Sequence, residues 1–366
     1  MPIRGSSATD IRPLIESLSA PDEIRRETAI ARLAIIGVRA VDRLTAAYAG
    51  ADGDRAKRIA ILRVLEAVGD ARGGPVAREA LHHGGDEALA AAGVLRALLD
   101  SPVGGAAADA LDALVAVALD RQVERRVRMA AFDALQDMPD EVRAQVATAV
   151  ADDPDAAVKA RATSTERDAP AGEAVWQDAI EGRLPDDPAS LREAAHTRAT
   201  SSPLSAIQKL VDALRARESA PGHAARRHEW LAVRGALHQA LALRASTVAV
   251  YDLRETVAEA SGSLPTTFLT ALHVIGDESC LEAIAIAYTR AAGTAPMDRE
   301  TPGTPSTDDE RWRHQLAGAF QAIVKREKIA RTSSVLKRIA TKWPGASRAV
   351  STTSRTTPRR KTPDRT

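Results

Sequence analysis

The chain has 366 residues, a formal net charge of +1 and no apolar run near the roughly 20 residues that a membrane-spanning helix needs. Its N-terminal residues lack an apolar run of signal-peptide length. The single cysteine, Cys280, excludes an intramolecular disulfide and a multi-cysteine zinc site. These features predict a soluble, cytoplasmic protein with no membrane contact.

Aromatic residues make up only 3% of the chain, whereas hydrophobic residues make up 45%. A compact core usually gains much of its buried area from large rings. A chain rich in alanine, leucine and valine must bury many small surfaces instead, which favours closely packed helices.

A leucine recurs along the chain with an apolar residue four positions before it and a glycine or proline four positions after it. Residues four apart lie on one face of a helix. The glycine then ends the helix by accepting a left-handed C-cap, and the proline ends it because it cannot continue the helix. The five segments are Ala29/Leu33/Gly37, Ile61/Leu65/Gly69, Val94/Leu98/Pro102, Ala131/Leu135/Pro139 and Phe268/Leu272/Gly276.

The first four of these leucines are 32, 33 and 37 residues apart, which leaves room in each period for two helices and two short turns. Further amphipathic stretches lie between them, and sustained strand alternation is absent. The pattern predicts an all-α fold of tandem helical hairpins over residues 1–162.

Two segments resemble known repeats. The stretch from Val127 to Leu135 is similar to the second helix of HEAT repeats, and the stretch from Leu272 to Asp277 resembles the HEAT-like repeats named after phycobilisome lyases. The resemblance covers about residues 9–162 and 247–343. It implies an armadillo-type α-solenoid, a superhelix whose second helices, near 22–36, 54–68, 86–100 and 122–138, line a concave surface.

The pattern breaks after the first array. Residues 163–203 indicate an irregular linker or a degenerate repeat, with a soft boundary near 163–175. A second helical array is expected over 204–343, interrupted by a proline-containing loop at 293–307. Residues 344–366 have too few apolar side chains to offset chain entropy, so a disordered basic tail is predicted there.

Charge is unevenly distributed. From Gln321 to Thr366, thirteen basic residues face only Glu327 and Asp364, so this end carries +11 and the remainder carries −10. Such an end can contact nucleic acid or another polyanion without sequence preference, or fold back onto the acidic remainder. The residues proposed for polyanion binding are Arg348, Arg355, Arg359, Arg360 and Lys361.

No catalytic, cofactor-binding or metal-binding residue is predicted. His228–Glu229 is the only His-Glu dyad, too few ligands for a metal site, and nucleotide-binding and hydrolase fingerprints are absent. His228 and His238 are expected to face solvent or to cap a helix. Cys280 is expected in the core.

Two basic runs on expected helices either line a groove or form a solvated face. They are Arg125–Arg126 with Arg128, and Arg226–Arg227.

The recurring leucine pattern, together with the lack of a recognisable set of catalytic residues, favours a non-catalytic protein-interaction scaffold over an enzyme. The alternative is sequence-independent nucleic-acid binding through the basic end. A third reading, an accessory to a lyase, depends only on the family name. A protein partner is expected, with no cofactor and no small-molecule substrate.

Overall fold

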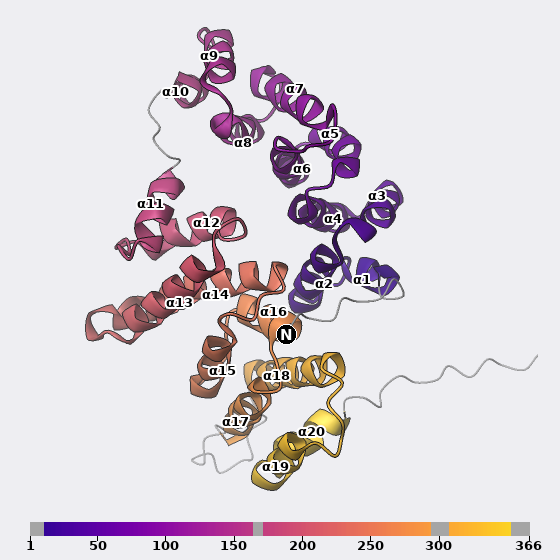
Figure 1. Ribbon diagram of the computed structural model, residues 1–366, viewed down its shortest axis with the longest axis vertical. Helices are drawn as coiled ribbons and strands as arrows, with labels where there is room; N and C mark the ends of the chain where they lie inside the picture. Colours follow the sequence, from indigo (N-terminus) through magenta and orange to yellow (C-terminus); the bar gives the residue numbers. More distant parts are fainter. Residues whose placement is uncertain (1–10, 164–170, 294–306, 353–366) are drawn as a thin grey trace, which may run out of the picture. The chain divides into compact units, whose positions relative to one another are not determined.

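The computed structural model describes residues 11–163, 171–293 and 307–352, and within these ranges the chain forms helices and turns without strands (Figure 1). None of the described helices combines the length and the apolar composition needed to cross a bilayer. Contacts divide the chain into unit 1, Met1–Ala245, and unit 2, Ser246–Thr366.

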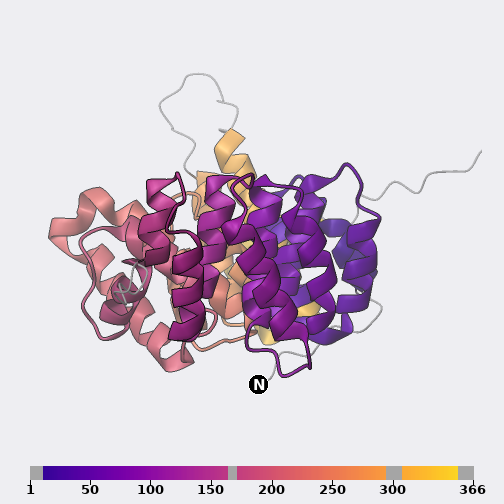
Figure 2. The same ribbon diagram turned by 90° about the horizontal axis from the view of Figure 1, so that it is seen from above.

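In the described part of unit 1 the helices pack mainly on their neighbours. Helices α2, α4, α6 and α8 pack on one another in sequence, and α5 and α7 pack beside them. Figure 2 shows the indigo-to-magenta helices of this unit standing side by side. The helices are α1 Ile11–Ser17, α2 Glu23–Ile36, α3 Val41–Ala49, α4 Arg55–Val68, α5 Gly74–Leu81, α6 Gly85–Leu98, α7 Ala106–Leu119, α8 Arg125–Ala134, α9 Asp140–Ala149, α10 Ala156–Thr163, α11 Ala171–Ile180, α12 Pro188–Arg198, α13 Leu204–Ser219 and α14 Arg227–Leu243.

The four register leucines of unit 1 are buried in a single core. Leu33, Leu65, Leu98 and Leu135 are each no more than 3% exposed, and all belong to one hydrophobic cluster that runs from Ile11 to Val158. Leu272, in unit 2, is also fully buried. The four register leucines of unit 1 therefore lie in one apolar seam, buried as their helical spacing predicts.

Side-chain caps and glycines set the ends of these helices. The carboxylate of Asp54 accepts a hydrogen bond from the amide of Lys57 at the start of α4. At the end of α4, Gly69 takes the left-handed conformation, and its amide donates to the carbonyl of Leu65. The left-handed cap that the sequence predicted is therefore confirmed at Gly69.

At Gly276 the predicted left-handed cap is wrong. Its φ is −58° and its ψ is 142°, an extended conformation that any residue adopts. Glycine is required at this position because a side chain has no space. A Cβ atom there would lie 2.7 Å from the carbonyl oxygen of Leu272 and 3.1 Å from Cδ1 of Ile323. Gly276 allows α16 and α18 of unit 2 to approach closely.

The segment from 163 to 203 contains helices. Residues 164–170 lie outside the described residues, but α11 and α12 pack on each other, and they also contact α13 and α14. Asp187 caps α12 by accepting from the amide of Ser190, and Pro188 occupies its first turn. The division between units falls after Ala245, so the predicted boundary near 163–175 lies inside unit 1.

Unit 2 contains six helices among its described residues. Helix α17 packs on α15 and α18, and α16 packs on α18. The helices are α15 Val250–Glu259, α16 Thr266–Ile275, α17 Cys280–Gly293, α18 Thr307–Arg326, α19 Ser334–Lys342 and α20 Pro344–Thr352. Of the predicted loop at 293–307, residues 294–306 lie outside the described residues.

The prediction of disorder from residue 344 onward is wrong for its first nine residues, which form α20. Helix α20 packs on α17, α18 and α19, and Ala346 is 2% exposed. A few small apolar residues are sufficient here because neighbouring helices supply the rest of the core. Residues 353–366 lie outside the described residues.

Candidate functional site

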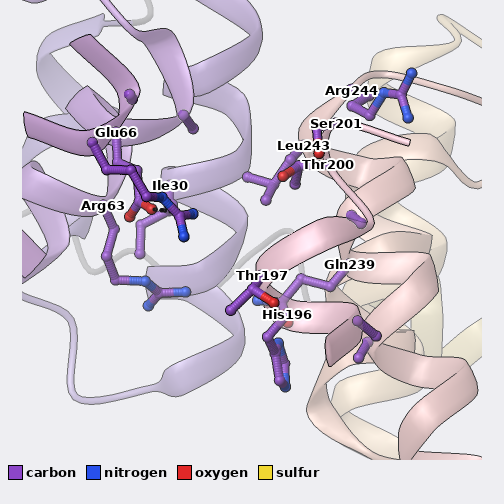
Figure 3. A pocket seen from close by; sticks show the side chains of 16 residues that line it. Ile30, Arg63, Glu66, His196, Thr197, Thr200, Ser201, Gln239, Leu243 and Arg244 are labelled. Atoms are coloured by element: carbon purple, nitrogen blue, oxygen red, sulfur yellow. Dashed lines mark ion pairs between the residues drawn. The ribbon is translucent and has the colours of Figure 1, made fainter. Parts of the chain in front are cut away.

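Unit 1 contains a pocket of about 380 Å³ between two groups of helices. One wall comes from α2, α4 and α6, and the other comes from α12, the turn after it and α14. In Figure 3, Arg63 projects from α4 toward His196 and Thr197 on the opposite wall. The pocket therefore joins residues more than a hundred positions apart in the sequence.

A hydrogen-bonded carboxylate connects the two walls. Oxygens Oε1 and Oε2 of Glu27 on α2 accept from the guanidinium of Arg63 at 2.6 and 2.8 Å. The Nε2 amide of Gln239 on α14 donates to Oε2 of Glu27 at 3.0 Å. These three side chains fix α2, α4 and α14 beside one another, and the two bonds to Glu27 hold the guanidinium of Arg63 in place.

Glu66 and Arg96 form a looser pair at the same wall. Their closest oxygen and nitrogen are 4.0 Å apart, and the two side chains are 38% and 36% exposed. Burial raises the pKa of Glu66, and this effect outweighs the opposing attraction of Arg96 and Arg63. The carboxyl group occupies the space left by Gly93, where a Cβ atom would lie 2.8 Å from Cδ of Glu66.

His196 lies on the opposite wall. Loss of surrounding water lowers its pKa, and the nearby guanidinium groups of Arg192 and Arg63 lower it further. The imidazole is therefore largely neutral at neutral pH. It supplies a hydrogen-bonding group to the pocket without adding charge.

The pocket carries a small positive charge. Arg63, Arg96 and Arg244 line it with Glu66, and Glu27 adjoins it, so three guanidinium groups face two carboxylates for a net charge of about +1. The Arg244 guanidinium donates to two backbone carbonyls, including that of Ser202 at 2.5 Å. Those bonds hold Arg244 in place but do not neutralise it.

A second polar cluster lies between α3, α4 and α6, and its groups are bonded to one another. Tyr48 donates its hydroxyl to Glu87 at 2.5 Å, and Glu87 also lies 2.9 Å from Nδ1 of His83 and 3.0 Å from Nε of Arg58. Burial would raise the pKa of Glu87, but its hydrogen bonds with Tyr48 and His83 and its attraction to Arg58 lower it. An ionised carboxylate with these partners serves to hold the helices together.

The predicted polyanion-binding residues are only partly described. Arg348 is exposed on α20, where its Nε donates to the carbonyl of Pro344 at 3.3 Å. Arg355, Arg359, Arg360 and Lys361 lie outside the described residues.

The first basic run forms contacts between neighbouring hairpins. Arg125 pairs with Asp155, and Arg126 pairs with Asp86. Arg128 is 4% exposed and donates to Asp153 at 2.5 Å and to the carbonyl of Ala118 at 3.0 Å. Neither a groove nor a solvated face describes Arg128, because the side chain is buried as a bridge between α8 and the turn before α10.

The second run begins before α14 and also forms contacts. The guanidinium of Arg226 bonds to Asp187 and Glu229, the acidic member of the His-Glu dyad. Arg227, the first residue of α14, is exposed. Arg226 thereby connects the start of α14 to the start of α12.

The histidines and the cysteine are distributed without a shared site. His228 is exposed as expected, but the expectation for His238 is wrong because that residue is fully buried in α14. Cys280 is buried as predicted, and burial raises the pKa of its thiol to about 11. Among the described residues, no group of three or more histidine, cysteine or acidic residues could hold a metal ion.

No protein-family model matches the chain, and no curated protein matches it in sequence. What the described residues show is an all-helical chain whose helices pack mainly on their neighbours. Sequence reasoning missed the pocket because its walls come from helices far apart in the chain. A local signal was the pair Arg63 and Glu66, polar residues three apart on α4 that flank the buried Val64 and Leu65.

Proposed function

We propose that the chain is a non-catalytic scaffold that binds a protein through a HEAT-like helical array in unit 1. The observation that carries this proposal is the position of α2, α4 and α6. These helices correspond to the second helices near 22–36, 54–68 and 86–100, and together they form one wall of the pocket. In HEAT-like arrays the second helices line the concave, ligand-binding side, and the same row here carries the pocket.

The stacking of neighbouring hairpins favours a rigid binding surface. Each hairpin buries its apolar face against the next, so the array is stable only when neighbours stack. The leucine face of each helix is used in this core, which leaves polar side chains such as Arg63 and Glu66 for the pocket wall. A partner would therefore meet a surface already ordered by the fold, which lowers the entropic cost of binding.

Site-specific photo-crosslinking in the full chain tests this proposal. A photoreactive amino acid replaces Ala67 or Ala97, two exposed alanines in the pocket wall, and in controls replaces Ala46 or Ala116, exposed alanines on α3 and α7. The expected result is a discrete crosslinked protein from the pocket positions only. Equal yields from all four positions, or no crosslinked protein from the two pocket positions, would contradict the proposal.

A second candidate function, sequence-independent binding of nucleic acid, is favoured by the exposed cations of the C-terminal helices. Among residues 321–352, eight basic residues face one acidic residue, Glu327, which is bonded to Arg326. The exposed cations are Lys325, Lys328, Arg331, Lys337, Arg338, Lys342 and Arg348. Cations of this kind follow the phosphate backbone, and their binding weakens with salt.

Filter binding of a DNA duplex at low salt tests the second candidate. Retention should fall with rising salt and should fall further when residues 353–366 are deleted, with the slope against log salt reduced by about 1 for each phosphate that the shortened chain no longer neutralises. Retention that is absent, or unchanged by the deletion, would remove the proposed role of Arg355, Arg359, Arg360 and Lys361.

A further inference from the structure

We infer that the unit 1 pocket binds a carboxylate side chain from an acidic segment of the partner protein, and that Arg96 is the group that meets it. This inference rests on the proposed function, since it names the chemistry of the partner at the same site. It follows from the charges of the pocket, from the state of each guanidinium group and from the shape of the lining.

Arg96 is the guanidinium group with the most unused hydrogen-bonding capacity. Arg63 is held by two bonds to Glu27, and Arg244 is held by two backbone carbonyls. Arg96 has an ion-pair partner only at 4.0 Å, beyond hydrogen-bonding distance. A guanidinium group presents a planar fork that matches a carboxylate with two parallel hydrogen bonds.

Glu66 is the carboxylate that a ligand would have to displace. It lies beside Arg96 on the same wall, and its only ion pair among the described residues is that loose contact at 4.0 Å. A ligand carboxylate at Arg96 would bring two negative charges close together, which favours protonation of one of them. Because burial already raises the pKa of Glu66, this residue is the one that would take up the proton.

Apolar surface surrounds these charges. Ile30 and Leu243 lie on opposite walls, and Ala67, Ala97 and Ala240 leave room between them. An aspartate or glutamate with an apolar neighbour would fill this space, with its carboxylate at Arg96 and its apolar neighbour against the alanines. A basic side chain would instead pair with Glu66, but it would face the three guanidinium groups of the pocket.

Selection from a displayed library of random heptapeptides tests the inference, with the full chain as bait. The wild-type chain and Arg39→Glu, a control at an exposed residue outside the pocket, should both enrich peptides with aspartate or glutamate beside an apolar residue. Arg96→Glu should lose that enrichment. No acidic enrichment, or equal acidic enrichment by Arg96→Glu, would overturn the inference.

Affinity measurements with one enriched peptide give the second readout. Replacing its acidic residue by the corresponding amide should weaken binding about tenfold, as expected when a charge-assisted hydrogen bond becomes a neutral one. Glu66→Gln should strengthen binding of the acidic peptide because it removes the competing carboxylate. Unchanged affinity in both comparisons would overturn the proposed contact even if Arg96→Glu were poorly folded.

Sodium valerate, a short monocarboxylate, distinguishes a free acid from a partner segment. Because the inference assigns the carboxylate to a protein segment, valerate at millimolar concentrations should not displace the peptide. Displacement by valerate at those concentrations would show that a free acid is sufficient and would overturn the inference. Crosslinking from Ala67 and Ala97 without acidic preference would reject the inference and leave the proposed scaffold intact. Absence of crosslinking from those positions would instead reject the scaffold.

Discussion

At the scale of single residues, several charged side chains are buried and paired, which their sequence pattern does not indicate. Arg128, Glu87, Glu218 and Arg234 are each 5% exposed or less. Charged residues are rarely buried unless they are paired. The sequence placed Arg128 in a groove or on a solvated face because basic runs usually lie there, and it could not reveal its partner Asp153, which is 25 positions away.

Breaking the buried pair between α13 and α14 should be strongly destabilising. Nε and Nη2 of Arg234 donate to the two carboxylate oxygens of Glu218 at 2.8 and 2.7 Å. Glu218→Ala would leave a buried guanidinium group without this partner, so we expect a loss of about 3–5 kcal/mol in the free energy of unfolding. Urea unfolding of the full chain measures it.

The paired replacement serves as the control for this prediction. Glu218→Leu with Arg234→Met removes both charges and keeps apolar volume, so it should cost much less than Glu218→Ala. If the double variant were as unstable as Glu218→Ala, the energetic cost would not arise from the unpaired charge.

Glu66 should make stability depend on pH in a defined direction. Its pKa in the folded chain lies above the ordinary value of 4.5, so the folded state favours the protonated form. The wild type should therefore lose stability relative to Glu66→Gln as pH rises from about 4.5 through the folded-state pKa. Below that range the stability difference between the two proteins should stop changing.

Urea unfolding of both proteins across this pH range provides the measurement. Because the Glu66 side chain is 38% exposed, solvent screening keeps the effect modest. A difference that is independent of pH, or one that grows as pH falls, would contradict the assignment.

At the scale of elements, the sequence predicted most of the helices observed at the start of unit 1. The expected helices near 22–36, 54–68 and 86–100 correspond to Glu23–Ile36, Arg55–Val68 and Gly85–Leu98. The leucine spacing carries this information because one helix face must be apolar along its whole length. The helices α11 and α12 were harder to predict because prolines and short apolar stripes obscure that periodicity.

The register leucines should matter far more than apolar residues outside the seam. Leu65 is 1% exposed, whereas Val38 is 55% exposed. Leu65→Ala should cost about 2–5 kcal/mol of unfolding free energy through reduced burial and a residual cavity. Val38→Ala should stay within about 0.5 kcal/mol.

Chemical denaturation compares these two variants directly. Similar midpoints for both would mean that Leu65 is not part of a packed seam.

Gly276 should resist substitution although its backbone angles are ordinary. A Cβ atom at Gly276 would lie 2.7 Å from a backbone oxygen, while one at Gly262 would meet nothing within 4 Å. We expect Gly276→Ala to lower the melting temperature by several degrees, since overpacking typically costs about 1–3 kcal/mol. Gly262→Ala, the matched control in the same unit, should melt near the wild type, and equal losses would contradict this account of Gly276.

At the scale of the molecule, the arrangement that creates the candidate site was not readable from the sequence. The pocket requires α12 and α14 to face α2, α4 and α6, and the bond from Gln239 to Glu27 spans 212 positions. Periodicity describes each helix and its neighbours, but it does not describe such distant pairings. The sequence therefore predicted the helices α2, α4 and α6, and the pocket that they form with α12 and α14 emerged only from the folded chain.

A charge swap tests the central claim, that unit 1 binds an acidic partner segment through Arg96, most directly. The measurement is the affinity of an enriched peptide, and of a version in which lysine replaces its acidic residue, for the wild-type chain and for Arg96→Glu. We expect Arg96→Glu to lose the acidic peptide and to bind the lysine version better than the wild type does. Arg96→Glu binding both peptides as the wild type does would contradict the claim.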